Sequence, residues 1–127
     1  MPNCLARTRT ARYVDNLNAV DSSNIASYLS KAAVLSLYKE VSLYPKPGLV
    51  SPIDSGSHVD MNYQMFLGSI NSLREYFGEI SKAGMAAERF SALQVLGIAA
   101  EARMMQATRG VNTHRGAIFN LGLLCAA

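Results

Sequence analysis

Residues 108–116 combine more hydrogen-bonding groups than a packed core would use. The segment reads Thr-Arg-Gly-Val-Asn-Thr-His-Arg-Gly and carries hydroxyl, amide, imidazole and guanidinium groups. An apolar stretch, residues 117–127, follows directly. Backbone N–H groups at a helix start and nearby arginine side chains both favour phosphate. The segment therefore predicts a site that receives an anionic ligand.

Residues 45–61 form a second polar cluster. They hold three of the four prolines, two glycines, two aspartates, a lysine and one of the two histidines. Pro45 and Pro47 restrict the backbone there and push the residues before them toward extended geometry. Loops of this composition are more often functional than idle, so we expect an ordered functional loop.

The composition narrows the class of protein. The net charge of +3 is mild, and no basic stripe with interleaved aromatic residues is present, so we expect no nucleic-acid partner. Cys4 and Cys125 lack metal-ligand spacing and predict a reduced, cytoplasmic setting. No apolar run reaches the length of a transmembrane helix, so we expect no membrane partner.

Apolar residues recur at helical spacing along most of the chain, and no strand pattern competes. The sequence therefore predicts an all-α helical bundle. After a loose N-terminal arm, 1–20, one helical domain fills 21–127, with helices over 21–43, 60–84, 86–107 and from 115 onward. Asp60 is the expected N-cap of the second helix, Gly84 closes it, and Asn112 or Thr113 caps the fourth.

Three of these helices carry a stripe of apolar members, which we expect to be buried in the second helix and to form the inner face of the third. The stripes are Ile25, Leu29, Ala32, Ala33, Tyr38 and Val41; Phe66, Ile70, Leu73, Phe77 and Ile80; and Phe90, Leu93, Leu96, Ala100 and Met104. Gly97 costs about 1 kcal/mol against Ala inside a helix, so we expect another backbone to approach it closely.

Three motifs in register carry a resemblance to a known family. They are Pro-Lys-Pro-Gly-Leu-Val at 45–50, Ser-Gly-Ser-His-Val-Asp-Met at 55–61 and Gly-Val-Asn-Thr-His-Arg-Gly-Ala-Ile-Phe at 110–119. With helices between them, they resemble the triphosphoribosyl-dephospho-CoA synthases over about residues 25–127. Family members are considerably longer, so the chain resembles their N-terminal part, truncated at its C-terminus.

The resemblance implies an all-helical transferase. The ribose 2′-hydroxyl of 3′-dephospho-CoA attacks C1′ of the ATP ribose, adenine leaves, and the triphosphate stays on the transferred sugar. The product is the prosthetic-group precursor of citrate lyase or malonate decarboxylase. The resemblance also implies ATP as a substrate and a requirement for Mg²⁺.

This chemistry needs groups around a triphosphate, a metal or carboxylate, and an acid and a base. Candidate substrate and phosphate contacts are Lys46, Gly48, Ser55, Gly56, Arg109, Asn112, Thr113 and Arg115. Lys46 is alternatively a solvated lysine on a turn. Arg115 opposes the helix dipole at a helix start, which costs a few tenths of a kcal/mol and favours a ligand role.

Candidate metal ligands are the carboxylates of Asp54, Asp60, Glu40 and Glu101, since Mg²⁺ takes one or two carboxylates plus phosphate oxygens and water. Candidate catalytic residues are His58, His114 and Asp54. Either histidine can hydrogen-bond phosphate or protonate adenine, and each has the alternative of a purely structural hydrogen bond. Met104, Met105 and Cys125 are expected in the core.

Two other interpretations of the chain remain open: an inactive helical fragment, or another nucleotide-processing helical enzyme with a different acceptor. The apolar fourth helix would normally be buried on all sides. We therefore expect an uncovered apolar face, self-association of the 127-residue chain, and no synthase activity from that chain alone. We also expect the two polar loops to converge in the fold.

Overall fold

The computed structural model describes the backbone of residues 4–127, and the side chains of Asp15 and of residues 20–127. This part of the chain contains helices and loops but no strand, as the apolar periodicity predicts. The helices are α1 (Cys4–Ser42), α2 (Tyr63–Ser72), α3 (Arg74–Met85), α4 (Phe90–Ala107) and α5 (Arg115–Ala126).

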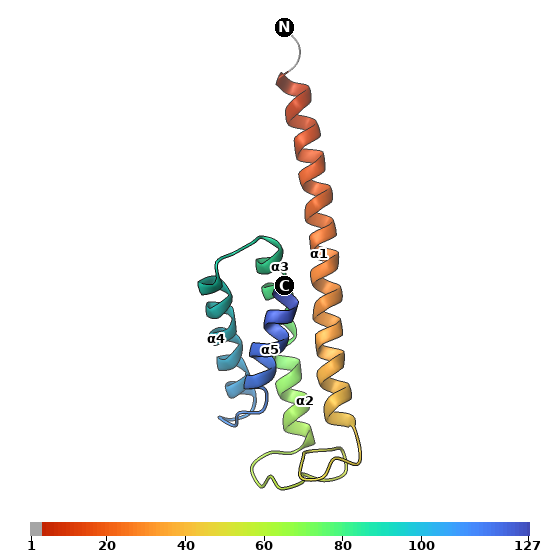
Figure 1. The fold of residues 1–127 in the computed structure, drawn as a ribbon, viewed down its shortest axis with the longest axis vertical. Coiled ribbons are helices and arrows are strands. Elements are labelled where there is room, and N and C mark those ends of the chain that lie inside the picture. Colours follow the sequence, from red (N-terminus) through yellow and green to blue (C-terminus); the bar gives the residue numbers. More distant parts are fainter. Residues whose placement is uncertain (1–3) are drawn as a thin grey trace.

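Helix α3 lies at the centre of the bundle and contacts all four other helices. Figure 1 shows α1 as one long helix along one side, α2 and α3 following each other beside it, and α4 on the opposite side. The first part of α1 projects beyond the other helices. The packed region therefore begins in the second half of α1.

The expected start of the first helix was wrong. The backbone is helical from Cys4, through the residues that we expected to form a loose arm, and the polar residues near Asp21 do not cap a helix. Residues 4–42 contain neither Gly nor Pro, so nothing in this segment interrupts a helix. The side chains of Cys4 and of Arg7, Arg9 and Arg12 lie outside the described residues.

The buried stripe of α1 differs partly from the apolar members seen in the sequence. Ala33 and Val41 are buried, but Ile25 and Tyr38 are 47% and 48% exposed. Ala26 and Leu37, their neighbours in sequence, are buried instead. Both members of each pair are apolar, so periodicity alone could not tell which one faces the core.

The second expected helix is divided at Leu73 into α2 and α3. Ser72 Oγ donates to the carbonyl of Ser69 at 2.6 Å, and the N–H of Leu73 donates to Ile70 O at 3.2 Å instead. Such back-bonding by a serine competes with the helical hydrogen bonds and bends helices. The break therefore follows from a local hydrogen bond.

The N-cap of α2 is Asn62, whose side chain accepts from the N–H of Met65 at 3.0 Å. The prediction that Asp60 caps this helix was wrong by two residues. The predicted stripe is confirmed: Ile70, Leu73, Phe77 and Ile80 are buried, and Phe66 packs against them. Tyr76, which was not expected in the core, is also buried.

Gly84 does not end α3, which runs one residue further to Met85. The left-handed residue of the turn is Ala87, with φ of 52°. Gly84 is instead a point of close approach, because a Cβ there would overlap the backbone of Ala126 at the end of α5. The left-handed turn and the glycine contact thus fall on two different residues.

Helix α4 begins at Phe90, four residues later than expected. Ala100 and Met104 are buried as predicted and Met105 packs against them, but Phe90 is 61% exposed. The expected close backbone approach at Gly97 was wrong, since the nearest atom to a Cβ there is Tyr76 Oη at 3.8 Å.

Helix α5 is only partly covered. Ile118 and Gly122 are buried, whereas Phe119 and Leu124 are 59% and 71% exposed. The predicted exposure of an apolar face on this helix is therefore present. Among the described residues, no helix combines the length and the apolar character that crossing a membrane requires.

Candidate functional site

The two polar loops lie at the same end of the bundle (Figure 1). One loop, 43–62, joins α1 to α2, and the other, 108–114, joins α4 to α5. Helices α1 and α4 both run toward this end, so the connections that follow them lie at the same end of the bundle. The predicted convergence of the loops at one end is confirmed. We call this region the loop end.

In the first loop, Lys46 folds back onto the last turn of α1. Its Nζ lies 2.7 Å from Glu40 Oε1 and 2.9 Å from the Glu40 carbonyl oxygen. The Lys46 side chain is only 11% exposed, so the interpretation as a solvated lysine on a turn was wrong. A cation at a helix C-terminus also complements the helix dipole. This pair joins two of the predicted site residues.

The middle of this loop is held by its own backbone. Asp54 Oδ1 accepts from the N–H of Gly56 at 2.8 Å, and the Asp54 carbonyl accepts from the N–H of Ser51 at 2.8 Å. Gly48 and Gly56 have φ of 75° and 57°, and a Cβ on Gly56 would overlap the backbone of Gly48. Asp54 and both glycines therefore have structural roles in an ordered loop.

His58 is half-buried in the same loop, and its N–H donates to the Ser55 carbonyl at 3.1 Å. Within the described residues, its imidazole forms no hydrogen bond with another side chain, and neither does the carboxylate of Asp60, which is exposed. The structure does not bring His58 or Asp60 into contact with the other predicted site residues.

The second loop turns at Arg109 and Gly110, both with positive φ. Thr108 is buried and its Oγ1 donates to the Met104 carbonyl at 2.9 Å, which fixes the start of the turn. Asn112 Oδ1 accepts from the N–H of Arg115 at 3.1 Å. The N-cap of α5 is His114, so the expectation that Asn112 or Thr113 occupies it was wrong. The Asn112 side chain nevertheless accepts from the first helical N–H, while the exposed Arg109 side chain faces solvent.

Arg115 already has an anionic partner. Its Nη2 and Nε lie 2.6 Å and 2.7 Å from Glu101 Oε1 on α4. The pair joins two predicted site residues and also explains how a cation is tolerated at a helix start. The unfavourable position of Arg115 at a helix N-terminus was the reason for inferring a ligand role. Since Glu101 already compensates for this position, that inference loses part of its basis.

His114 is the buried centre of this loop, with 5% of its surface exposed. Its Nδ1 lies 2.7 Å from Ser69 Oγ on α2, and its N–H donates to Met104 Sδ at 3.1 Å. Thr113 Oγ1 donates to the same Ser69 Oγ at 2.6 Å. Phe66 meets the imidazole edge-on, with ring centroids 5.0 Å apart. The other ring nitrogen, Nε2, is buried and has no partner.

Burial lowers the pKa of His114 to about 4, and the opposing negative charge of Glu40 compensates only partly. His114 is therefore neutral near pH 7. The influence of Glu40 also links the two loops, because Glu40 holds Lys46 and acts electrostatically on His114.

The predicted metal ligands are not gathered in one place. Among the described residues, no group of three or more His, Cys, Asp or Glu side chains could hold an ion. Glu40 and Glu101 belong to different ion pairs. The protein therefore does not form a metal cage from these carboxylates alone.

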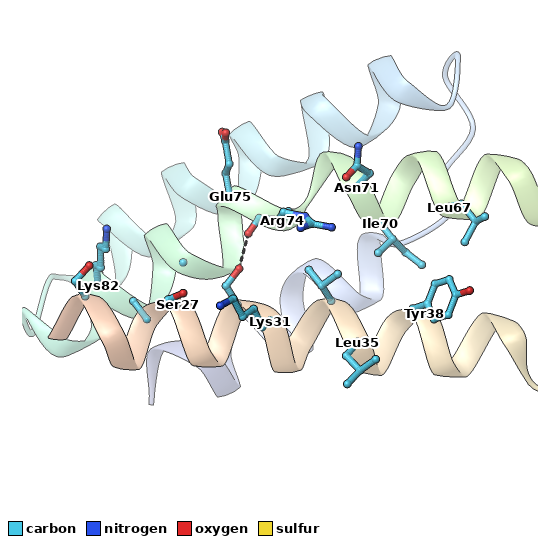
Figure 2. A pocket seen from close by; sticks show the side chains of 15 residues that line it. Ser27, Lys31, Leu35, Tyr38, Leu67, Ile70, Asn71, Arg74, Glu75 and Lys82 are labelled. Carbon is cyan, nitrogen blue, oxygen red and sulfur yellow. Dashed lines mark hydrogen bonds between the residues drawn. The ribbon is translucent and has the colours of Figure 1, made fainter. Parts of the chain in front are cut away.

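A cleft between α1 and the α2–α3 segment was missed by the sequence analysis. It has a volume of about 720 Å³, and Figure 2 shows side chains from both sides lining it. Lys31, Arg74 and Lys82 bring positive charge to it, and Ser30 Oγ donates to the Arg74 carbonyl at 2.7 Å across it. The signal in the sequence was the run of small residues Ser23, Ser27 and Ser30, which share one helical face.

This architecture is an all-α bundle with two polar loops at one end and a cleft between α1 and the α2–α3 segment. The chain belongs to the family described as ATP:dephospho-CoA triphosphoribosyl transferase, or CitG, whose model matches residues 26–127.

Curated relatives agree with this assignment. A probable 2-(5′′-triphosphoribosyl)-3′-dephosphocoenzyme-A synthase of Acinetobacter calcoaceticus is 48% identical over 108 residues, covering 85% of this chain and 37% of the relative. The synthase of Pectobacterium atrosepticum is 39% identical over 86% of this chain and 41% of the relative. The protein CitXG of Haemophilus influenzae is 40% identical over 90% of this chain and 26% of the relative.

The chain thus spans well under half the length of the curated relatives that it matches. No solved structure matches it significantly.

Proposed function

We propose that this chain forms part of a triphosphoribosyl-dephospho-CoA synthase that works in a reduced, cytoplasmic setting. The 2′-oxygen of 3′-dephospho-CoA forms a bond to C1′ of the ATP ribose. The C1′–N9 bond breaks, adenine leaves with its electron pair, and the hydroxyl proton passes to adenine or solvent. The observation that carries this proposal is the family match over residues 26–127, which contains both polar loops.

The loop end is the proposed binding region for the triphosphate of ATP. Lys46 and Arg115 are held there by carboxylates, and Arg109 is exposed. Cations and backbone N–H groups stabilise phosphate charge without a covalent step. His114 is proposed to contact the substrate through its unpartnered Nε2. His58, Asp54, Ser55 and Thr113 are proposed to belong to the same region.

Mg²⁺ is proposed to enter this region with ATP. Mg²⁺ takes one or two protein carboxylates and completes its shell with phosphate oxygens and water. Glu40 and Asp54 are the carboxylates proposed to hold it, and it would neutralise part of the triphosphate charge. Asp60 and Glu101 are the other candidates: Asp60 is exposed in the same loop, and Glu101 is bound to Arg115 as Glu40 is to Lys46.

The cleft of Figure 2 is the proposed place for the acceptor, 3′-dephospho-CoA. Its three cations outnumber its one carboxylate, Glu75, and so suit a diphosphate. The apolar side chains of Val34, Leu67 and Ile70 suit the less polar part of such a ligand. Within the described residues, Lys31, Arg74 and Lys82 form no ion pair with a carboxylate, so all three cations are available.

The test is adenine release from ATP in the presence of 3′-dephospho-CoA. We would use a chimera in which the matching segment of the Acinetobacter calcoaceticus relative is replaced by residues 20–127 of this chain. We expect the chimera to be active and Lys46→Ala to lower the rate by on the order of a hundredfold. Lys39→Ala, an exposed lysine in the last turn of α1, is the matched control.

The outcomes separate the competing interpretations. A folded chimera that releases no adenine would contradict the proposal and favour an inactive fragment. Release with another nucleotide acceptor but not with 3′-dephospho-CoA would favour a different enzyme. Equal losses in Lys46→Ala and Lys39→Ala would remove Lys46 from the site.

A further inference from the structure

Ser69 lies at a position that the sequence motifs did not mark. It is fully buried on α2 and has two side-chain partners in the loop 108–114. Thr113 Oγ1 is 2.6 Å and His114 Nδ1 is 2.7 Å from its hydroxyl oxygen. A buried hydroxyl between two loop residues fixes their orientation relative to the helix.

The hydroxyl protons available around Ser69 Oγ determine which nitrogen of the neutral imidazole carries a proton. A serine hydroxyl has one proton to donate and accepts through its lone pairs. Thr113 donates to Ser69 Oγ, so the proton of Ser69 is free to donate to His114 Nδ1. Nδ1 then accepts and carries no proton. In a neutral imidazole the remaining proton must be on Nε2.

Nε2 is the ring nitrogen that is buried without a partner. We propose that Ser69 and Thr113 are positioning residues, which hold His114 as a neutral imidazole whose Nε2–H donates a hydrogen bond to an oxygen of an anionic ligand. The position of the proton is inferred from the donation by Thr113 and from His114 Nδ1 being the acceptor within reach of the Ser69 hydroxyl, whereas the ligand role rests on the proposed function. Because Nε2 is buried, the atoms that cover it must move before a ligand oxygen can reach it.

The surroundings of His114 agree with a neutral ring. The apolar Phe66 ring packs against the imidazole in a T-shaped arrangement, and the sulfur of Met104 accepts from the backbone N–H of His114. Glu40 is the charged group that acts on it, and this effect is smaller than that of burial. A neutral N–H is a hydrogen-bond donor and a poor acid. The proposal therefore removes His114 as the acid that protonates adenine, one of the roles expected from the sequence.

The first test is the tautomer itself. In the 127-residue chain carrying ring-¹⁵N histidine, the nitrogen chemical shifts at pH 7 distinguish a protonated from an unprotonated ring nitrogen. His58→Gln removes the only other histidine signal and assigns His114. We expect a proton on Nε2 and none on Nδ1. A proton on Nδ1, or a mixture of tautomers, would overturn the proposal.

The second test asks whether Ser69 causes this state. We expect Ser69→Ala to give a mixture of tautomers and to raise the titration midpoint of His114 by about one pH unit, since the donor to the neutral ring is lost. Ser69→Thr keeps the hydroxyl and should restore the Nε2–H form. Ser81→Ala is the matched control, because Ser81 is also fully buried but donates to the Phe77 carbonyl on α3 and does not contact His114.

Circular dichroism of each variant shows whether the helices persist. If a Ser69 variant is unfolded, the tautomer of the parent chain still decides the proposal. A folded Ser69→Ala variant with an unchanged tautomer and midpoint would remove Ser69 as the positioning residue.

The third test adds inorganic triphosphate, and separately ATP, to the labelled chain. We expect either ligand to move the Nε2–H proton signal, because a new hydrogen bond to oxygen forms. No shift, with the Nε2–H tautomer retained, would overturn the ligand role while leaving the positioning by Ser69 intact. A shift with ATP but not with triphosphate would assign the contact to the nucleoside.

Discussion

Gly122 of α5 packs its bare Cα against the phenol of Tyr76 of α3, and a Cβ at Gly122 would overlap the phenolic oxygen. The same hydroxyl donates to the Ile118 carbonyl on α5 at 2.8 Å. Burial raises the pKa of Tyr76 to about 12, so the phenol stays protonated as this donation requires. A small residue and a polar aromatic thus set how closely α3 and α5 approach.

Gly122 contacts Tyr76, whereas Gly116 on the same helix has open space around it. Substitution of the two glycines by alanine should therefore change stability in opposite directions. Gly122→Ala should lower the free energy of unfolding by about 1–3 kcal/mol, because the added methyl group forces Tyr76 or the helix to move. At Gly116 no heavy atom lies within 4 Å of an added Cβ. Gly116→Ala should therefore raise the free energy of unfolding by up to about 1 kcal/mol through helix propensity. Urea denaturation of both variants measures the difference. Equal effects would show that the contact carries no strain.

The pH dependence of stability should report His114. Its folded pKa is about 4, against an ordinary value of 6.5, so between these values the unfolded chain binds more protons than the folded one. The stabilising contribution is complete above about pH 6.5 and is lost as the pH falls toward 4. At 1.36 kcal/mol per pKa unit, the loss is about 3 kcal/mol.

The measurement is the free energy of unfolding between pH 7.5 and pH 4. His114→Gln should flatten the curve over this range, and His58→Gln, the matched control, should not change it. A parent chain whose stability is constant between pH 6.5 and 4 would contradict the burial of a neutral His114.

The fold could be predicted from the sequence where apolar periodicity was strong. Ile70, Leu73, Phe77 and Ile80 are spaced so that only one helical face can hold them, and all four are buried. The buried face of α1 was harder to predict, because apolar residues lie next to each other in the sequence at several positions. The start of α1 at Cys4 was missed because polar residues near Asp21 were interpreted as the N-cap of the helix. No Gly or Pro interrupts the helical backbone before them.

The candidate site was predictable only as two polar loops. Motif residues such as Lys46 and His114 lie in them, but their partners are far away in sequence. The His114 side chain is hydrogen-bonded to Ser69, which is 45 residues away in the sequence. The Arg115 side chain is hydrogen-bonded to Glu101 on the preceding helix. Ser69 is one serine among many on α2 and its neighbours, so nothing in its local sequence indicates that it binds a histidine.

Arg115 offers a test that separates stability from binding. It is 57% exposed in its pair with Glu101, and exposed pairs contribute less than about 1 kcal/mol. Arg115→Ala should therefore barely change the urea midpoint. If Arg115 contacts phosphate, the affinity for ATP should fall roughly tenfold or more, since a charged hydrogen bond is worth about 1.5–3 kcal/mol.

Isothermal titration with ATP measures this loss. The matched control is Arg103→Ala, because Arg103 pairs with Glu75 and Glu79 on α3 rather than at the loop end. Equal ATP affinities for the parent, Arg115→Ala and Arg103→Ala would assign Arg115 to structure alone.

The groove between α4 and α5 should drive self-association of the 127-residue chain. It has a volume of about 240 Å³ and a mostly apolar lining, in which Phe90, Ile98 and Phe119 are each about 60% exposed. Contiguous apolar surface of this kind favours association because water is released from it. Sedimentation velocity should show oligomers that grow with protein concentration.

Substitution within the groove should reverse this behaviour. Phe119→Glu places a charge on the exposed face of α5, where burial against a second copy would be costly, and should shift the chain toward a monomer. Val95→Glu is the matched control, because Val95 is 66% exposed on α4 but does not line the groove. If both variants dissociate the oligomer equally, general charge repulsion explains the effect. A parent chain that sediments as a monomer at all concentrations would show that the groove does not mediate self-association.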